Sequence, residues 1–174
     1  MSQYEVKLLM AAILDNTLNF KAQITTDRDK NAYNFLKKKI KISNFDKYYF
    51  NECEKTILNN IAETIKLDTK IEKVSDSLPS IISQFIIWDF DTLKNKINEI
   101  CTELEKIGKD WMCNIIELEK GYSYILCANS EPKKKIENIF NKNYTNSNIL
   151  KLDRLYLRKE IIKLVKDMND SKIS

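Results

Sequence analysis

The sequence predicts an α/β protein: a small mixed β-sheet covered by helices and preceded by a helical segment. From residue 66 onward, short runs rich in β-branched and aromatic residues alternate with segments of helical periodicity, which is the pattern of a sheet covered by helices. Before residue 66 only helical patterns occur. We therefore divide the chain into a helical segment, residues 1–65, and an α/β domain, residues 66–174.

Three helices are expected in the helical segment. Residues 3–18 place apolar side chains near helical spacing. Residues 28–39 follow a Thr-Thr-Asp capping cluster and end in a lysine run that suits the helix dipole. Residues 44–68 repeat apolar side chains every four residues and predict one longer helix. The apolar side chains of these patterns are Tyr4, Leu8, Ala11, Ala12, Leu18, Tyr33, Phe35, Leu36, Tyr49, Cys53, Ile57 and Ile61.

The α/β domain is expected to run in the order β-β-α-β-β-α-β-α. Its predicted elements are a strand within 66–74, a turn at 75–80, a buried strand at 81–90, a helix at 91–110, a hairpin of 111–119 and 122–130 around Lys120-Gly121, a helix at 131–143, and a strand, turn and helix within 147–170. Leu93, Ile97, Ile100 and Leu104 form the inner face of the first helix, and Gly108 suits its end. Pro132 fits the first turn of the next helix.

Composition excludes several classes of function. Glycine and proline occur twice each, so a glycine-rich phosphate loop is absent. The net charge of +4 comes from lysines mixed with acids, which disfavours a dedicated nucleic-acid surface. The cysteines form no C-x-x-C pair and histidine is absent, so a zinc site is not expected. No apolar run is long enough to cross a bilayer and no signal peptide is recognisable. We expect a cytoplasmic protein with reduced thiols.

The first candidate site combines Asp15 and Asn16 with Lys21, next to a predicted helix start. A carboxylate and an amide oxygen are hard ligands of the kind that Mn²⁺ or Mg²⁺ accepts. The alternative is a surface turn in which the Asp and Asn side chains hydrogen-bond to their own backbone.

Two further candidates are basic. Lys70 lies near the start of the first predicted strand, where its ammonium can supply a charge to a phosphate or merely protect a sheet edge from aggregation. Arg158 and Lys159 open the last predicted helix, where arginine and the helix amides can bind a phosphate. The alternative for this pair is a solvated surface. Basic residues in a first helical turn oppose the dipole unless an anion is present, which favours binding.

The order and separation of four segments are similar to one family: LLMAAILDNTLNFKAQITTDRD, YYFNECEKTILNNIAETIKLDTK, IISQFIIWDF and LDRLYLRKEII. The chain resembles the C-terminal part of a DHH-superfamily phosphoesterase of the manganese-dependent inorganic pyrophosphatase, exopolyphosphatase and prune type. The resemblance spans nearly the whole chain. It implies that residues 1–65 are the helical end of the DHH catalytic domain and residues 66–174 the second-type DHH-associated, substrate-binding domain. It also implies a hydrolase of pyrophosphate or polyphosphate that uses Mn²⁺ or Mg²⁺.

The phosphate-binding residues implied by the resemblance are Lys70, Arg158, Lys159 and Lys21, with Thr25 in support. The metal-binding aspartate of the family falls on Asn16, which carries no charge, and Asp15 lies one position earlier. The other metal ligands of the family belong to histidine-bearing motifs, and this sequence has no histidine. We therefore assign no catalytic residue and expect no turnover by this chain alone, with or without a bound metal ion.

Two hypotheses of different classes follow. In the first, the chain is the substrate-binding half of a DHH-type phosphohydrolase, either a fragment of a longer enzyme or one piece of a split enzyme in which a separate chain carries the missing motifs. In the second, it is a stand-alone, non-catalytic module that binds a phosphate ligand or a protein, and a bare apolar helix face drives formation of a homodimer or binding of a partner protein. Binding of a nucleic acid through the lysines is a weaker third interpretation, and no membrane partner is expected.

Overall fold

The computed structural model describes residues 1–145 and 147–171. Its elements are α1 (Gln3–Thr17), α2 (Asp27–Lys37), α3 (Phe45–Asn59), α4 (Ile61–Asp68), β1 (Thr69–Ile71), β2 (Ile81–Ile87), α5 (Phe90–Leu93), the 3₁₀ turn η1 (Lys94–Lys96), α6 (Ile97–Ile107), β3 (Trp111–Glu117), β4 (Tyr122–Leu126), α7 (Ser130–Phe140), β5 (Ile149–Lys151) and α8 (Arg158–Asp170). The predicted order of strands and helices from residue 66 onward is confirmed. No described helix is both long enough and apolar enough to cross a membrane.

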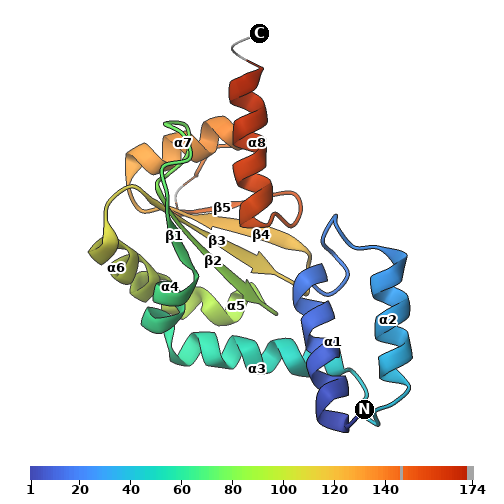
Figure 1. Cartoon of the computed structure of the whole chain (residues 1–174). Coiled ribbons are helices and arrows are strands. Elements are labelled where there is room, and N and C mark those ends of the chain that lie inside the picture. Colours follow the sequence, from blue (N-terminus) through green and yellow to red (C-terminus); the bar gives the residue numbers. More distant parts are fainter. Residues whose placement is uncertain (146, 172–174) are drawn as a thin grey trace.

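The sheet is mixed and has the strand order β1-β2-β3-β4-β5. Strands β2 and β3 are parallel, and the other neighbouring strands are antiparallel. Helices α4, α5 and α6 cover one face with an apolar cluster that includes Phe85, Leu93 and Trp111. Helices α7 and α8 cover part of the other face, over Ile82 and Met112. Both faces are therefore covered by helices, as predicted (Figure 1).

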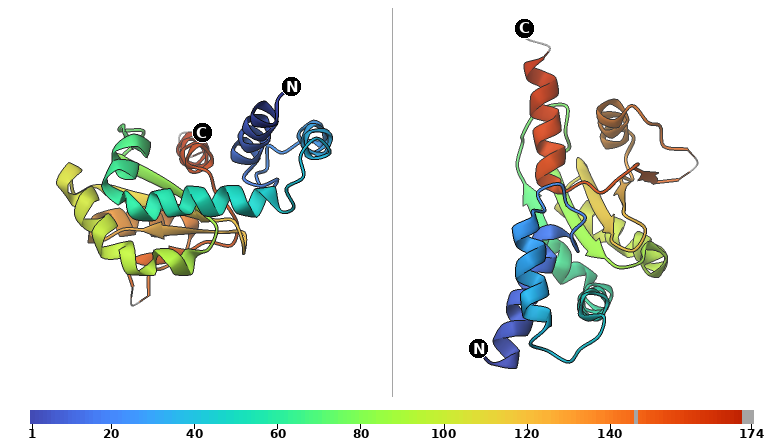
Figure 2. Two further views of the ribbon diagram at one scale, coloured as in Figure 1. Left: turned by 90° about the horizontal axis from the view of Figure 1, so that it is seen from below. Right: turned by 90° about the vertical axis from the view of Figure 1, so that its right-hand side faces the viewer.

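The N-terminal helices form a lobe beside the sheet. Helix α3 runs from the sheet to α1 and α2, which lie side by side at its far end (Figures 1 and 2). Their cluster, which includes Met10, Leu14 and Phe50, also takes in Ile116 at the end of β3. Helix α4 instead shares the core of the sheet through Ile61 and Ile65. Apolar packing thus continues across residue 65, and the domain division at that residue stays a prediction.

Three predicted elements differ in extent. The helix expected over 44–68 is interrupted at Asn60, whose φ of −141° is not helical. The N–H of Asn60 donates to Ile57 O at 3.1 Å and its side-chain amide donates to Thr56 O at 3.1 Å, so the residue ends α3 instead of continuing it. The strand expected within 66–74 shrinks to β1 because α4 continues through Asp68. The helix expected over 91–110 divides into α5, η1 and α6 because Asp89 caps a separate first turn.

The buried face of α1 also differs from the predicted one. Val6, Met10 and Leu14 are buried, whereas Tyr4 and Leu8 are 74% and 58% exposed. Helix α1 carries apolar side chains on two sides, and periodicity alone does not decide which side packs. On the later helices, Leu93, Ile100 and Leu104 are fully buried as predicted.

Helix α3 is tied to the sheet through a buried carboxylate. Glu54 is 7% exposed, and its Oε2 accepts hydrogen bonds from the backbone N–H groups of Trp88 and Asp89 at 2.6 and 3.0 Å. These two donors lie just beyond the end of β2. A charge-assisted acceptor therefore satisfies both donors where the strand stops.

Replacing Glu54 by Ala should lower the free energy of unfolding by about 2–4 kcal/mol, because it removes the carboxylate and leaves two backbone donors without an acceptor. Urea denaturation measures this loss. The control is Glu52→Ala on the same helix, which removes an exposed ion pair with Lys55 and should cost less than about 1 kcal/mol. Equal losses for the two variants would contradict the bridging role of Glu54.

Candidate functional site

Three buried polar side chains cross the middle of the sheet face that α8 covers. Gln84, Asn114 and Ser123 come from β2, β3 and β4, and each is at most 9% exposed. Alternation along each strand places them on the same face as the apolar residues Ile82, Met112, Ile116 and Ile125. We call these three residues the polar belt. A belt of this kind must find hydrogen-bond partners, because unpaired polar groups are costly in a core.

The polar belt binds the backbone that leads into α8. The N–H of Tyr156 donates to Ser123 Oγ at 2.9 Å, and Asn114 Nδ2 donates to Tyr156 O at 2.7 Å. The N–H of Arg158 donates to Gln84 Oε1 at 2.7 Å. Each strand of the belt therefore contributes a contact, and together these contacts fix the start of α8 on the sheet.

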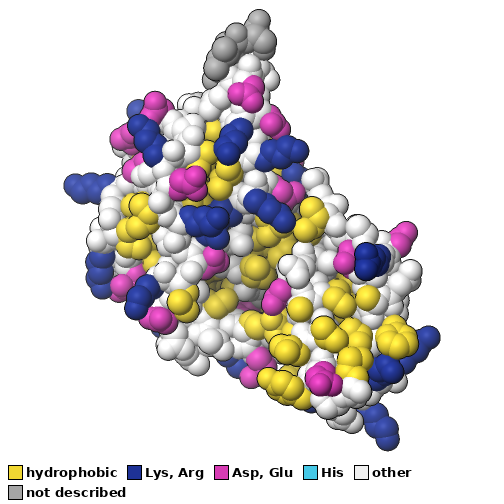
Figure 3. Space-filling view, in the orientation of Figure 1, with side chains coloured by type: hydrophobic (Ala, Val, Ile, Leu, Met, Phe, Trp, Pro, Cys, Tyr) yellow, Lys and Arg dark blue, Asp and Glu magenta, His cyan; other side chains and the backbone are white. Residues whose placement is uncertain are grey.

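A pocket of about 290 Å³ opens at the start of α8. It is lined by Asp15, Asn16, Lys70, Gln84, Leu157, Arg158, Lys159 and Ile162. The structure thus brings together five of the six residues predicted from the sequence as phosphate- or metal-binding, from α1, β1 and α8. Sequence reasoning missed Gln84, which lies in an apolar strand. Figure 3 shows basic side chains gathered near the start of α8, beside the apolar surface of the N-terminal lobe.

The basic side chains of the pocket are held to different degrees. Lys70 and Lys159 are exposed, and within the described residues neither forms a salt bridge with a carboxylate. Arg158 is only 15% exposed and pairs with Asp68, with Nη2 and Oδ1 2.9 Å apart. Two exposed lysines and one fixed arginine can neutralise the charge of a polyanion, and the arginine adds directional hydrogen bonds.

Asp15 faces the pocket from the C-terminal end of α1. Its Oδ2 accepts a hydrogen bond from the hydroxyl of Tyr49 at 2.7 Å. Burial raises the pKa of the Asp15 carboxyl above its ordinary 3.8, while the Tyr49 bond acts in the opposite direction. Burial and the same bond raise the pKa of Tyr49, so its hydroxyl remains a donor at neutral pH. Asn16, next to Asp15, donates from Nδ2 to Ala12 O at 2.9 Å.

Asp15 and Asn16 do not make a metal centre by themselves. They offer one carboxylate and one amide oxygen, whereas Mg²⁺ takes six oxygen ligands in octahedral geometry. Within residues 1–145 and 147–171, no group of three or more Cys, Asp or Glu side chains is arranged to hold a metal ion. Further ligands would have to come from water, substrate or another chain, and we derive no step through a metal ion.

Lys21 and Thr25 lie outside the pocket lining. Lys21 Nζ donates to the carbonyl oxygens of Leu118 and Glu119, the second at 3.1 Å, in the hairpin after β3. Thr25 Oγ1 donates to Thr17 O at 3.4 Å. The Lys21 contacts hold the segment after α1 against the hairpin, and the Thr25 contact ties that segment to the end of α1. Lys21 therefore lies apart from the other predicted phosphate-binding residues, and its role in binding phosphate stays a prediction.

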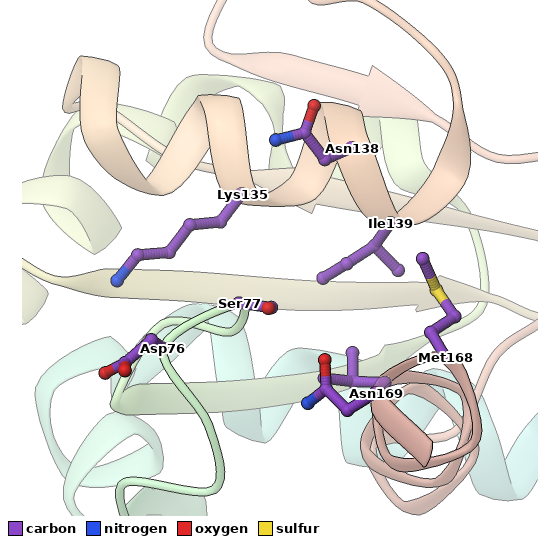
Figure 4. A pocket seen from close by; sticks show the side chains of 8 residues that line it. Asp76, Ser77, Lys135, Asn138, Ile139, Met168 and Asn169 are labelled. Carbon is purple, nitrogen blue, oxygen red and sulfur yellow. The ribbon is translucent and has the colours of Figure 1, made fainter. Parts of the chain in front are cut away.

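A larger pocket of about 440 Å³ lies between α7, the loop after β1 and the C-terminal half of α8 (Figure 4). Its lysine, Lys135, pairs with Asp110 at 2.8 Å, and its carboxylate, Asp76, pairs with Lys73 at 2.8 Å. The charges on its walls are therefore already neutralised. Chemistry rather than size singles out the smaller pocket as the candidate site.

Comparison with known proteins supports a related fold. No family model matches the chain, and no curated protein does. Among solved structures, a candidate family II inorganic pyrophosphatase from Methanococcus jannaschii superposes with a TM-score of 0.67 at 21% sequence identity. The match covers 95% of this chain and 57% of that protein. The chain therefore has the fold of a little over half of this neighbour.

Asp15→Asn should raise the melting temperature at pH 7. A carboxyl whose pKa is raised by folding favours the folded state below pH 3.8, and that advantage is lost as the pH rises through the folded-state pKa. At pH 7 the ionised carboxyl therefore destabilises the folded state. Asparagine removes this charge, and its side-chain oxygen can still accept the hydrogen bond from the Tyr49 hydroxyl. The difference should vanish below pH 3.8. Thermal melts from pH 3 to 7 measure it, and a less stable variant at pH 7 would contradict this assignment.

Proposed function

We propose that the chain is the phosphate-binding half of a DHH-type phosphohydrolase that acts on pyrophosphate or polyphosphate. The observation that carries this proposal is the pocket at the start of α8, which gathers Lys70, Arg158 and Lys159. The fold shared with the Methanococcus protein supports the same class. Because the chain spans 57% of that neighbour, the complete activity is part of the proposal.

The chemistry of the pocket suits a polyanion. Arg158 and Lys159 occupy the first turn of α8, where their charges oppose the helix dipole. A bound phosphate removes this repulsion, because its negative charge interacts favourably with the positive end of the helix dipole and with both side chains. In this proposal the two lysines neutralise negative charge along the phosphate chain, while Arg158 fixes the position of one phosphate group.

Hydrolysis would require groups that this chain does not offer at the pocket. In the proposal, a Mn²⁺ or Mg²⁺ ion in the complete enzyme would supply the activation of water that hydrolysis needs, and most of its ligands would come from another segment of a longer enzyme or from a separate chain. Asp15 and Asn16 line the pocket and would be the ligands that this chain offers to that metal ion. The isolated chain is proposed to bind without turnover.

Arg158→Ala should weaken pyrophosphate binding about 10- to 100-fold, as expected for loss of charge-assisted hydrogen bonds. Lys70→Ala and Lys159→Ala should weaken it by smaller factors. Isothermal titration calorimetry in metal-free buffer measures the affinity, and a phosphate-release assay with added Mn²⁺ tests for turnover in the same samples. Thermal melts confirm that each variant is folded.

Lys163→Ala is the matched control, because Lys163 is exposed on α8 outside the pocket lining. The affinity of the Lys163→Ala variant for pyrophosphate should equal that of the wild type. Absence of pyrophosphate binding by the wild type, or equal affinities for Arg158→Ala and Lys163→Ala, would overturn the proposed function. Turnover that depends on Arg158 would overturn the proposed inactivity of the isolated chain.

A second candidate function, a stand-alone interaction module, is favoured by one observation. Helices α1 and α2 expose Leu8, Leu9 and Phe35 at 58%, 47% and 61%, and a groove of about 350 Å³ lies between the two helices. Figure 3 shows apolar side chains gathered over this lobe. Exposed apolar surface of this kind is typical of interaction sites, and a second copy of the chain is the occupant we propose for this alternative.

If the alternative holds, sedimentation should show a concentration-dependent dimer that Leu8→Glu and Phe35→Glu each convert to a monomer, because each buries a charge at the interface. Leu67→Glu is the control, since Leu67 is 77% exposed on α4, away from this groove. A wild-type chain that stays monomeric at all concentrations would rule out the dimer.

A further inference from the structure

We propose that Asp68 is a positioning residue for the pocket at the start of α8: it fixes the guanidinium of Arg158 so that one free edge of that group is ready for a phosphate. The inference rests on the proposed function and deepens it. Asp68 does not line the pocket itself, so it can affect a ligand there in two ways: through its contacts with Arg158, or through the field of its charge.

Asp68 holds the guanidinium at two points. Arg158 Nη1 donates to the backbone oxygen of Asp68 at 2.6 Å, and Nη2 donates to its Oδ1 at 2.9 Å. Nη1 also donates to the backbone oxygen of Ile82 at 3.3 Å. These acceptors come from the end of α4 and from β2, so the guanidinium is anchored to two separate elements.

An inventory of donors shows what remains for a ligand. A guanidinium has five N–H groups in a planar fork. Both donors of Nη1 and one donor of Nη2 are taken by Asp68 and Ile82. The other Nη2 donor and the Nε donor have no acceptor among the described residues. These two lie on the same edge of the group, and such an edge forms paired hydrogen bonds to a phosphate.

The position of Asp68 also links Arg158 to the segment of the chain that carries Lys70. Asp68 is the last residue of α4, and Lys70 lies two positions later in β1. The hydrogen bonds between Asp68 and Arg158 therefore join the start of α8 to the strand that carries Lys70. Gln84 adds a second link, because it accepts from the backbone N–H of Arg158 itself.

Charge alone predicts the opposite effect from positioning. A carboxylate near the pocket repels a phosphate, so its removal would tighten binding if only net charge mattered. Positioning predicts weaker binding, because a loose arginine loses more conformational entropy when the ligand binds. A comparison of Asp68→Ala with Asp68→Asn separates the two effects, since both variants remove the same charge and only asparagine keeps a side-chain acceptor.

Calorimetry with pyrophosphate in metal-free buffer should show that Asp68→Ala binds about three- to tenfold more weakly than Asp68→Asn. In an Arg158→Ala background this difference should disappear, because the two residues act as a unit. Equal affinities for the two single variants, with wild-type binding intact and dependent on Arg158, would overturn the inference and leave the proposed function standing. A difference that persists without Arg158 would also overturn it.

An NMR readout tests the contact without any ligand. The chain has only three arginines, Arg28, Arg154 and Arg158, so three Nε–H signals are expected and Arg158→Lys assigns one of them. That signal should be sharp and well dispersed in the wild type and in Asp68→Asn. It should be shifted or broadened in Asp68→Ala, where only the Nη1 bonds to backbone oxygens remain. An unchanged signal in Asp68→Ala would overturn the inference.

Calorimetry and NMR together distinguish failure of the proposed function from failure of this inference. If the wild type does not bind pyrophosphate, or binds it equally well without Arg158, the proposed function fails and the inference falls with it, whatever the NMR signal shows. If Arg158 is required and Asp68 is not, only the inference fails.

Discussion

The polar belt on the sheet is the constraint on which the rest of the site depends. Gln84, Asn114 and Ser123 are buried in the middle of a sheet face, where unpaired amides and hydroxyls would cost folding free energy. Their partners are backbone groups of Tyr156 and Arg158. The belt therefore holds the chain at the start of α8 through three hydrogen bonds, although Asn114 Oδ1 stays buried without a partner among the described residues.

The start of α8 differs from an ordinary surface helix start because its first two residues, Arg158 and Lys159, are basic. Arg158 and Lys159 put positive charge where the dipole is already positive, and Lys70 adds to it from β1. Asp68 offsets part of this charge, and Asp15 faces the same pocket with a pKa raised by burial. The pocket thus gathers three basic side chains and one exposed carboxylate, Asp15, and this excess of positive charge suits a polyanionic ligand.

Much of the fold could be predicted from the sequence because its signals are local: alternation in the strands, spacing of Ile100 and Leu104, and basic residues at a helix start. The same signals gathered Lys70, Arg158 and Lys159 as candidates. What they could not supply was long-range pairing. Nothing near Lys21 indicates that it binds carbonyl groups in the hairpin after β3, almost a hundred residues later. Gln84 and Asp68 were missed as site residues because their roles depend on a helix that begins far along the chain.

The most direct test of the central claim is a pyrophosphate titration of the ¹⁵N-labelled chain in metal-free buffer, followed in the amide spectrum. Our account predicts that the largest shift changes occur at Asn16, Lys70, Arg158 and Lys159, around the start of α8. Changes centred on the larger pocket near Asp76 and Lys135, or no changes at all, would contradict it.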